Sequence, residues 1–241
     1  MASMQTVDDV SLSSIEVGLA TCDESTEYTE QARPNLDCWR YRQLKRMIDI
    51  FGSSVMIVAF AIPGLLIAIA VFFTSKGPIF YREQRVGRGG RPFQIWKFRT
   101  MQLKIAKAGR LQHAQPGKDA LEWRMRKHLC DSRITSIGAF LRSWSLDELP
   151  QLFNVLRGEM SLVGPRPIVA AETALYGDLI DYYLTAVPGL SGLWQVSGRS
   201  NVGYTERALL DAQYVQTWTL RIDFRIYFMT IPAVLGRIGA R

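Results

Sequence analysis

A run of 26 residues without a charged side chain, residues 50–75, constrains the fold of this chain more than any other feature of its sequence. Most of these residues are Ile, Val, Leu, Ala or Phe. About 20 such residues are enough for a helix to cross the hydrocarbon core of a bilayer. A buried core helix is the alternative, but core helices rarely run this long, so the pattern favours a segment placed in a membrane.

Pro63, followed by Gly64, lies at the middle of this run. Because proline lacks a backbone donor and clashes with the preceding turn, a helix should bend or break there. Two paths are then open, a kinked span and a re-entrant helix that leaves on the side it entered. Basic residues lie on both sides of the run: Arg40, Arg42, Lys45 and Arg46 before it, and Arg82, Arg85, Arg88 and Arg91 after it. Since positive charge accumulates on the cytoplasmic side, we expect the re-entrant path.

Charge divides the chain into three parts. Residues 1–37 hold eight acidic residues and one basic residue, and we expect this acidic tail to be disordered. Residues 38–76 form the basic flank and the re-entrant helix broken at Pro63. We expect residues 77–241 to form a cytoplasmic domain with interfacial helices. Three distant cysteines and two histidines in the whole chain argue against a disulfide framework, a zinc site and a Ser–His–Asp triad.

The third part has a mixed α/β pattern that is mostly helical. Two strand-like stretches, 79–81 and 93–98, flank a glycine-rich turn, which closes a hairpin more often than it cradles a phosphate. Helices are expected within 141–156 (interrupted near Pro150), 170–184 and 203–218, and turns at 164–167 and 188–192. Residues 104–133 fit a mobile loop or a helix on the membrane surface. The end, 221–241, fits an amphipathic helix on the bilayer or a core helix. The predicted fold is therefore a monotopic membrane protein with a small hairpin.

Asp147 and Glu148 form an adjacent carboxylate pair. On a helix, neighbouring side chains point about 100° apart, so one carboxylate can attack while the other holds a metal or moves a proton. Such pairs commonly lie on a solvated face. Here, however, the pair stands between apolar residues and five positions after Arg142.

Several arginines lie at or near turns: Arg99, Arg166 within Gly164-Pro165-Arg166-Pro167, and Arg199 after Gly198. Arginine held by a rigid turn suits bidentate capture of phosphate, although any single one is more often in a surface ion pair. Carboxylates and arginines together fit a nucleoside diphosphate with Mg²⁺.

The chain resembles the bacterial sugar transferase family, the monotopic phosphoglycosyl transferases, from residue 45 to about residue 235. The resemblance is carried by Lys45-Arg46 with Asp49, and by 77–87 (GPIFYREQRVG), 97–101 (KFRTM), 131–135 (DSRIT), 146–151 (LDELPQ), 154–155 (NV), 158–167 (GEMSLVGPRP), 188–190 (PGL) and 195–199 (QVSGR). The sequence departs from the family pattern at Ser191, where Thr is frequent, and at Glu159, where Asp is frequent. With no further apolar run before residue 45, the chain resembles the minimal catalytic form.

The resemblance implies an activity and a site. A phosphosugar would pass from a UDP-sugar to undecaprenyl phosphate, releasing UMP, through an aspartyl phosphosugar intermediate at the bacterial cytoplasmic membrane. Asp147 would be the nucleophile, and Mg²⁺ would lie at Asp147 and Glu148. Arg142, Arg166 and Arg199 would handle phosphate, with Asp211 orienting an arginine and Pro63 breaking the re-entrant helix.

Two other functional classes would fit part of this sequence. The basic body, +14 over residues 38–241, would suit a membrane-anchored nucleic-acid-binding module, but no helix-turn-helix, zinc or RNP pattern accompanies it, so we expect no nucleic-acid partner. A non-catalytic polyprenyl-phosphate scaffold would not need the Asp147-Glu148 pair. The sequence leaves open which sugar is transferred (galactose, glucose or an N-acetylhexosamine), which polysaccharide is made, and whether the chain forms a homo-oligomer.

Overall fold

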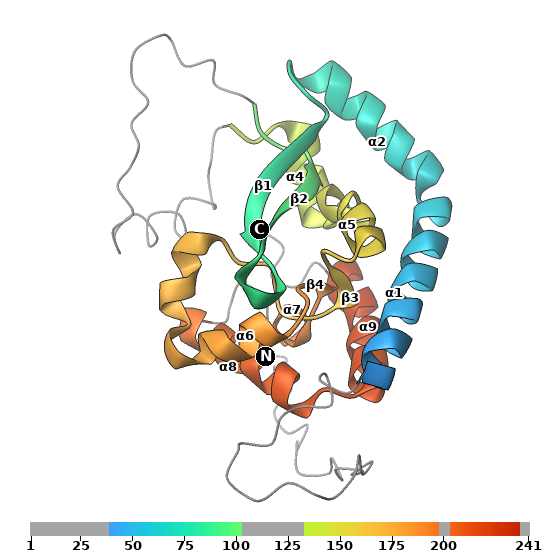
Figure 1. Ribbon diagram of the computed structural model, residues 1–241. Coiled ribbons are helices and arrows are strands. Elements are labelled where there is room, and N and C mark those ends of the chain that lie inside the picture. Colours follow the sequence, from blue (N-terminus) through green and yellow to red (C-terminus); the bar gives the residue numbers. More distant parts are fainter. Residues whose placement is uncertain (1–38, 103–132, 198–202, 237–241) are drawn as a thin grey trace, which may run out of the picture. The chain divides into compact units, whose positions relative to one another are not determined.

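The computed structural model describes residues 39–102, 133–197 and 203–236 (Figure 1). This part is mostly helical with one small hairpin, as the sequence predicted, and it has a second two-stranded sheet that the sequence did not predict. The acidic tail, residues 104–132 and Arg199 lie outside it, so the predictions made for them stay predictions.

The elements before the carboxylate pair are α1 (Trp39–Ala59), α2 (Ala61–Thr74), β1 (Phe80–Val86), the 3-10 turn η3 (Arg88–Gly90), β2 (Pro92–Phe98) and α4 (Ser136–Ser143). Those that follow are η4 (Leu146–Glu148), α5 (Gln151–Arg157), β3 (Ser161–Val163), η5 (Ala170–Leu175), η6 (Gly177–Leu179), α6 (Ile180–Thr185), β4 (Gly189–Ser191), α7 (Leu193–Val196), α8 (Tyr204–Thr217) and α9 (Leu220–Leu235).

The apolar run folds as two helices, α1 and α2, separated at Phe60. Pro63 has no N–H to offer the carbonyl of Ala59, so α1 ends at Ala59 and the chain bends three residues before the proline. No single helix in the described ranges is long and apolar enough to cross a bilayer. Together the two helices, bent by 62°, reach that length and composition, as a broken span or a re-entrant loop.

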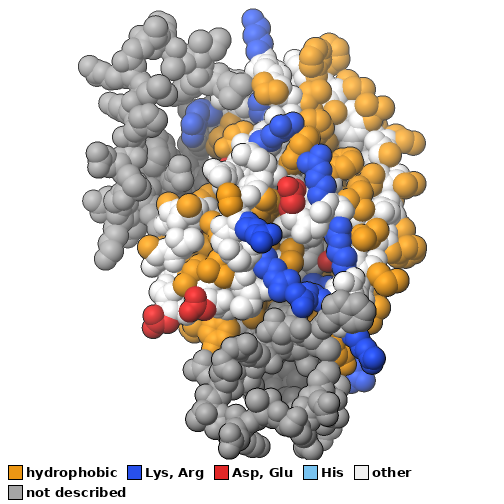
Figure 2. All heavy atoms as spheres, in the orientation of Figure 1, with side chains coloured by type: hydrophobic (Ala, Val, Ile, Leu, Met, Phe, Trp, Pro, Cys, Tyr) orange, Lys and Arg blue, Asp and Glu red, His pale blue; other side chains and the backbone are white. Residues whose placement is uncertain are grey.

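Large apolar side chains cover the outer face of α1 and α2 (Figure 2). Phe51, Val58 and Phe73 are 74%, 77% and 81% exposed. Helix α9 also has an exposed apolar face. Its Phe224 and Phe228 are exposed, while other apolar residues of the helix are buried in the core. One face of α9 belongs to the core, as the core-helix interpretation of 221–241 expects, and the other presents apolar side chains outward. The placement of this helix on a bilayer stays a prediction.

Strands β1 and β2 pair as the predicted antiparallel hairpin, with Gln84 opposite Gln94. Gly89 and Gly90 in its turn have positive φ angles of 64° and 77°, which glycine adopts without steric cost. Strands β3 and β4 pair in parallel, Ser161 with Gly189 and Val163 with Ser191. The sequence predicted only a turn at 188–192, because strands of three residues are too short to show an alternating pattern.

The main core packs α5, α8 and α9 around β3, with Leu152, Val155, Val215, Trp218 and Ile226 almost fully buried. Helix α1 is joined to this core through polar contacts as well as apolar ones.

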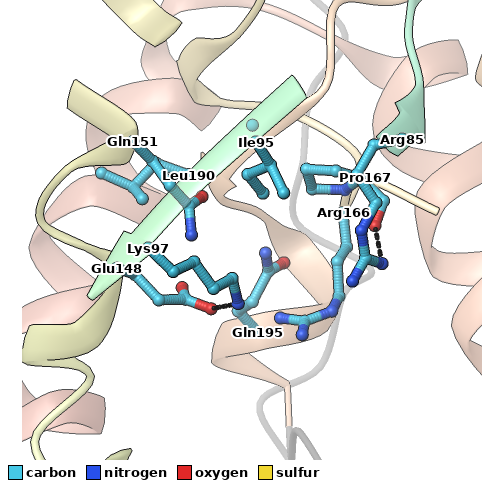
Figure 3. Close-up of a pocket in the computed structure, with 10 residues that line it drawn as sticks. Arg85, Ile95, Lys97, Glu148, Gln151, Arg166, Pro167, Leu190 and Gln195 are labelled. Atoms are coloured by element: carbon cyan, nitrogen blue, oxygen red, sulfur yellow. Dashed lines mark hydrogen bonds and ion pairs between the residues drawn. The ribbon is translucent and has the colours of Figure 1, made fainter. Parts of the chain in front are cut away.

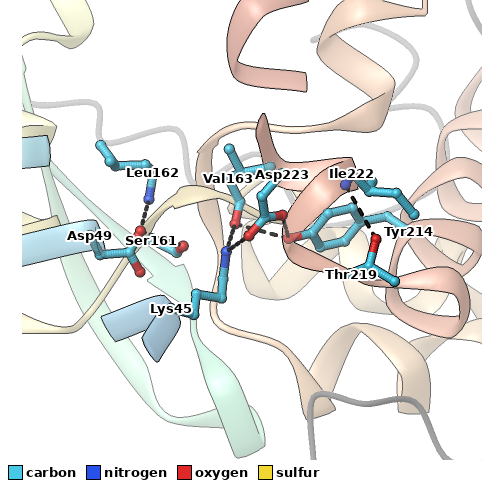
Figure 4. A network of polar contacts seen from close by, with 9 residues as sticks. All are labelled: Lys45, Asp49, Ser161, Leu162, Val163, Tyr214, Thr219, Ile222 and Asp223. Atoms are coloured by element: carbon cyan, nitrogen blue, oxygen red, sulfur yellow. Dashed lines mark hydrogen bonds and ion pairs between the residues drawn. The ribbon is translucent and has the colours of Figure 1, made fainter. Parts of the chain in front are cut away.

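A buried polar network links α1 and α9 to strand β3 (Figure 4). Asp49 accepts hydrogen bonds from the Ser161 hydroxyl (3.0 Å) and the Leu162 amide (2.9 Å). Lys45 donates to the Val163 carbonyl (2.9 Å) and pairs with Asp223 on α9. Strand β3 leads directly into 164–167, so the network sets where that turn begins.

Candidate active site

The carboxylate pair lies on η4, a single 3-10 turn between α4 and α5. Helix α4 begins with a Thr135 cap, whose hydroxyl accepts the Gly138 amide (2.9 Å). Ser145 then turns the chain with φ 54°, the one positive φ outside glycine among the described residues. Such a conformation costs energy and is often found at functional sites. The sequence predicted an interruption near Pro150, and the structure places it at residues 144–150.

The carboxyl of Asp147 is 9% exposed, and its environment changes its acidity. Burial raises its pKa to about 6, and the charge of adjacent Glu148 acts in the same direction. The cations Lys97 and Arg142 act in the opposite direction. Asp147 is therefore poorly hydrated and less acidic than an ordinary aspartate, and the nearby cations favour its ionised form, which suits a carboxylate nucleophile.

Glu148 lies at the edge of a small polar pocket (Figure 3). Lys97 from β2 donates a hydrogen bond to its Oε1 over 2.7 Å. The pocket is also lined by Arg85, Gln151, Arg166, Pro167 and Gln195. The hairpin, the η4–α5 segment and the 164–167 turn thus contribute charged or polar groups to one space.

Arg142 and Arg166 reach this region from different elements. Arg142, at the end of α4, donates through Nε to the Thr100 hydroxyl (2.9 Å) and stabilises the Asp147 anion. Arg166 lines the pocket with its guanidinium 5.2 Å from the centre of the Trp194 ring. Burial lowers the pKa of Arg166, Glu148 raises it, and two further arginines, Arg207 and Arg85, lower it again. A cluster of this kind attracts an anion.

Asp211 on α8 is 1% exposed. It accepts a hydrogen bond from the Tyr176 hydroxyl (2.7 Å). Burial raises its pKa to about 6, against the opposing effects of Arg207, Tyr176 and the main-chain amide of Arg166. The charge of Arg207 and the main-chain amide of Arg166 thus act on Asp211, and its role in orienting an arginine stays a prediction.

Arg99 has a different place from the one predicted. It is 4% exposed and donates to the Ser75 hydroxyl (3.1 Å) and to the carbonyls of Ser75 (2.6 Å) and Pro78. These acceptors lie at and just beyond the end of α2. Because its donors are engaged by the chain itself, Arg99 closes the end of α2 and does not line the pocket.

The family is shown by comparison with known proteins. A family model described as bacterial sugar transferase matches residues 40–237. The chain belongs to the bacterial sugar transferase family. It is 47% identical over 192 residues to the exopolysaccharide production protein ExoY of Rhizobium meliloti, covering 79% of this chain and 84% of that protein.

Two longer relatives carry more specific names. The undecaprenyl-phosphate galactose phosphotransferase of Salmonella typhimurium is 48% identical over 200 residues, which are 83% of this sugar transferase and 42% of that protein. The UDP-glucose:undecaprenyl-phosphate glucose-1-phosphate transferase of Caulobacter vibrioides is 40% identical over 199 residues, 79% of this chain and 69% of that protein. The chain spans less than half the length of several curated relatives it matches.

The Asp147 and Glu148 carboxylates are the side chains of the site that could bind Mg²⁺. No cluster of three or more acidic, histidine or cysteine ligands occurs within the described segments. Mg²⁺, however, commonly binds through one or two carboxylates plus substrate phosphates and waters. Asp147 and Glu148 repel each other, and a cation between them and a diphosphate would relieve that repulsion.

The sequence did not identify some residues of the site. Lys97 and Gln151 stand inside the family-like motifs 97–101 and 146–151, yet residue type alone did not single them out. Arg85 was noted only as one of several bases that flank the apolar run. Arg207, buried on α8 near Trp194, belongs to no motif and could be found only from the fold.

Proposed function

We propose that this sugar transferase moves a sugar 1-phosphate from a UDP-sugar to undecaprenyl phosphate at the cytoplasmic face of a bacterial membrane, releasing UMP. The names of the Salmonella and Caulobacter relatives support the two substrates, and ExoY supports a role in exopolysaccharide assembly. The observation that carries the proposal is the buried Asp147 carboxyl, with its raised pKa, next to a pocket lined by Lys97, Glu148 and Arg166.

In the proposed reaction, the Asp147 carboxylate attacks the phosphorus that bears the sugar. The bond from that phosphorus to the bridging oxygen breaks, and UMP leaves with this oxygen. An oxygen of the lipid phosphate then attacks the same phosphorus and releases the Asp147 carboxylate. The covalent aspartyl phosphosugar divides one transfer into two easier steps.

The surrounding groups have separate tasks. Arg166, which lines the pocket together with Glu148, binds the diphosphate, and Arg142 and Lys97 favour the ionised form of Asp147. Fixed cations placed before the reaction stabilise charge that builds on the phosphate oxygens in the transition state. When bound by Asp147 and Glu148, Mg²⁺ would neutralise part of the same charge.

The position of α2 supports a lipid acceptor. Ile67, Ala68 and Val71 of α2 pack in one cluster with Leu146 and Leu149, which flank the carboxylate pair. Helix α2 therefore packs directly against the segment that carries Asp147, while its other side exposes apolar residues such as Phe73. A lipid phosphate and a water-soluble nucleotide sugar meet only at a membrane surface, so this contact suits the proposed reaction.

The deciding experiment uses the full chain in vesicles that contain undecaprenyl phosphate. UMP release is measured with UDP-galactose, UDP-glucose and UDP-N-acetylhexosamines, which also identifies the sugar. Without acceptor, the sugar-labelled donor should leave label on the protein at Asp147 after acid quenching. Absence of UMP release with every donor would contradict the proposal, and would favour a non-catalytic polyprenyl-phosphate scaffold.

A further inference from the structure

The side-chain amide of Gln151 is a buried donor without an acceptor. Gln151 is the first residue of α5 and is 2% exposed. Within the part of the chain that the structure describes, nothing accepts a hydrogen bond from its Nε2. Buried polar groups in native proteins are nearly always paired, and an unpaired one lowers stability. An orphaned amide at this position therefore calls for a partner that the protein itself does not supply.

The location of Gln151 indicates what that partner is. Its carboxamide points into the pocket, toward the space between the Glu148–Lys97 pair and Gln195 (Figure 3). It follows Glu148 by three residues, and Leu149 and Pro150 between them have right-handed helical φ and ψ angles, so the two side chains lie on the same side of this segment. Arg85, across the pocket, likewise has a buried Nε that no described residue accepts from. A ligand with acceptor oxygens would satisfy both of these donors.

We propose that Gln151 donates a hydrogen bond from Nε2 to an oxygen of the phosphoryl group that Asp147 attacks. This inference rests on the proposed function. A phosphoryl group supplies acceptor oxygens and no donors, and its oxygens gain negative charge as the reaction proceeds. A fixed neutral donor is therefore worth more in the transition state than in the bound ground state, and Gln151 contributes to turnover more than to binding.

The test compares Gln151→Met with a matched control, Gln213→Met, at an exposed position on α8. Methionine has nearly the shape of glutamine but no donor. We expect Gln151→Met to lower kcat by about 100-fold, the usual effect of removing one such donor, with KM changed by less than about threefold. Its melting temperature should equal or exceed that of the wild type, because an unpaired buried amide is removed. Gln213→Met should match the wild type in kcat and KM.

A second measurement separates this inference from the proposed function. Calorimetry with UDP alone should show slightly weaker binding to Gln151→Met, by about twofold to threefold, and unchanged binding to Gln213→Met. Wild-type kcat in Gln151→Met would overturn the inference and leave the proposed function intact. A lowered melting temperature with a matching loss of activity would also overturn it, because Gln151 would then be structural. If the wild type released no UMP from any donor, the proposed function would fail, and equal UDP affinity of the two proteins would overturn the role of Gln151.

Discussion

Lys97 on β2 holds Glu148 on η4 through a hydrogen bond of 2.7 Å between Nζ and Oε1. The pair stands beside Asp147, and its two charges affect that carboxyl in opposite directions: Glu148 raises its pKa and Lys97 lowers it. The hairpin thus tunes a carboxylate that lies about 50 residues further along the chain, and the acidity of Asp147 depends on packing between elements distant in sequence.

The first prediction concerns pH. Because the pKa of Asp147 is raised to about 6, kcat/KM for UMP release should fall as the pH drops through about 6, where the nucleophile becomes protonated. Lys97→Met removes a cation that lowers this pKa, so the acidic limb should move to higher pH. A pH profile of initial rates measures both. An acidic limb that stays in place in Lys97→Met would contradict this role of Lys97.

The second prediction concerns Asp147→Asn. An amide cannot form the aspartyl phosphate, so transfer and covalent labelling should both be lost. The folded-state pKa of Asp147 lies above its ordinary value, so its ionised form destabilises the fold at neutral pH. Asp147→Asn should therefore melt at the same or a higher temperature at pH 7. Near-wild-type turnover by the purified variant would remove Asp147 from the nucleophile's role.

The third prediction concerns Arg166→Lys. Two prolines fix the backbone on either side of Arg166, and Trp194 lies under its guanidinium. A planar fork can hold two phosphate oxygens, whereas an ammonium acts as a point charge, so kcat should fall by roughly tenfold or more. Steady-state UMP release and a thermal melt are measured together. Unchanged turnover with a lowered melting temperature would show that Arg166 only steadies the turn.

The fourth prediction concerns the network in Figure 4. The side chains of Lys45 and Asp223 are 12% and 13% exposed, so Lys45→Met leaves a largely buried carboxylate that has lost its charged partner and keeps the hydrogen bond from the Tyr214 hydroxyl. Breaking a buried pair in this way costs about 3–5 kcal/mol of unfolding free energy. The double variant Lys45→Met/Asp223→Leu should recover part of this loss. Denaturant unfolding in detergent measures it, and a double variant less stable than Lys45→Met would argue against the pair.

The fifth prediction concerns membrane topology. Bases flank the bent pair α1–α2 on both sides, and we expect both ends of the pair to be cytoplasmic. With Cys22, Cys38 and Cys130 replaced, Arg40→Cys and Lys76→Cys should resist an impermeant maleimide in intact cells and react after permeabilisation. Labelling of Lys76→Cys in intact cells would instead indicate a broken span.

The sequence alone predicted the features that local pattern encodes. The hairpin followed from alternation around a glycine-rich turn, and the break in the apolar run followed from Pro63, although the bend lies three residues earlier, at Phe60. The parallel pairing of β3 and β4 could not be predicted, because each strand is three residues long and its partner lies about 28 residues away. That pairing sets the start of the turn that carries Arg166.

Residue types in the sequence showed which chemistry the site can perform. The tertiary structure showed which of those residues line the pocket. Carboxylates and arginines beside prolines were visible as residue types, which is why Asp147, Glu148 and Arg166 were found. Arg99 and Gln151 show what residue type cannot tell. The guanidinium of Arg99 is engaged by carbonyls near the end of α2, while the neutral amide of Gln151 stands in the pocket without an acceptor. Whether a donor is free for a ligand depends on which backbone groups packing brings within about 3 Å of it, and those groups lie far apart along the chain.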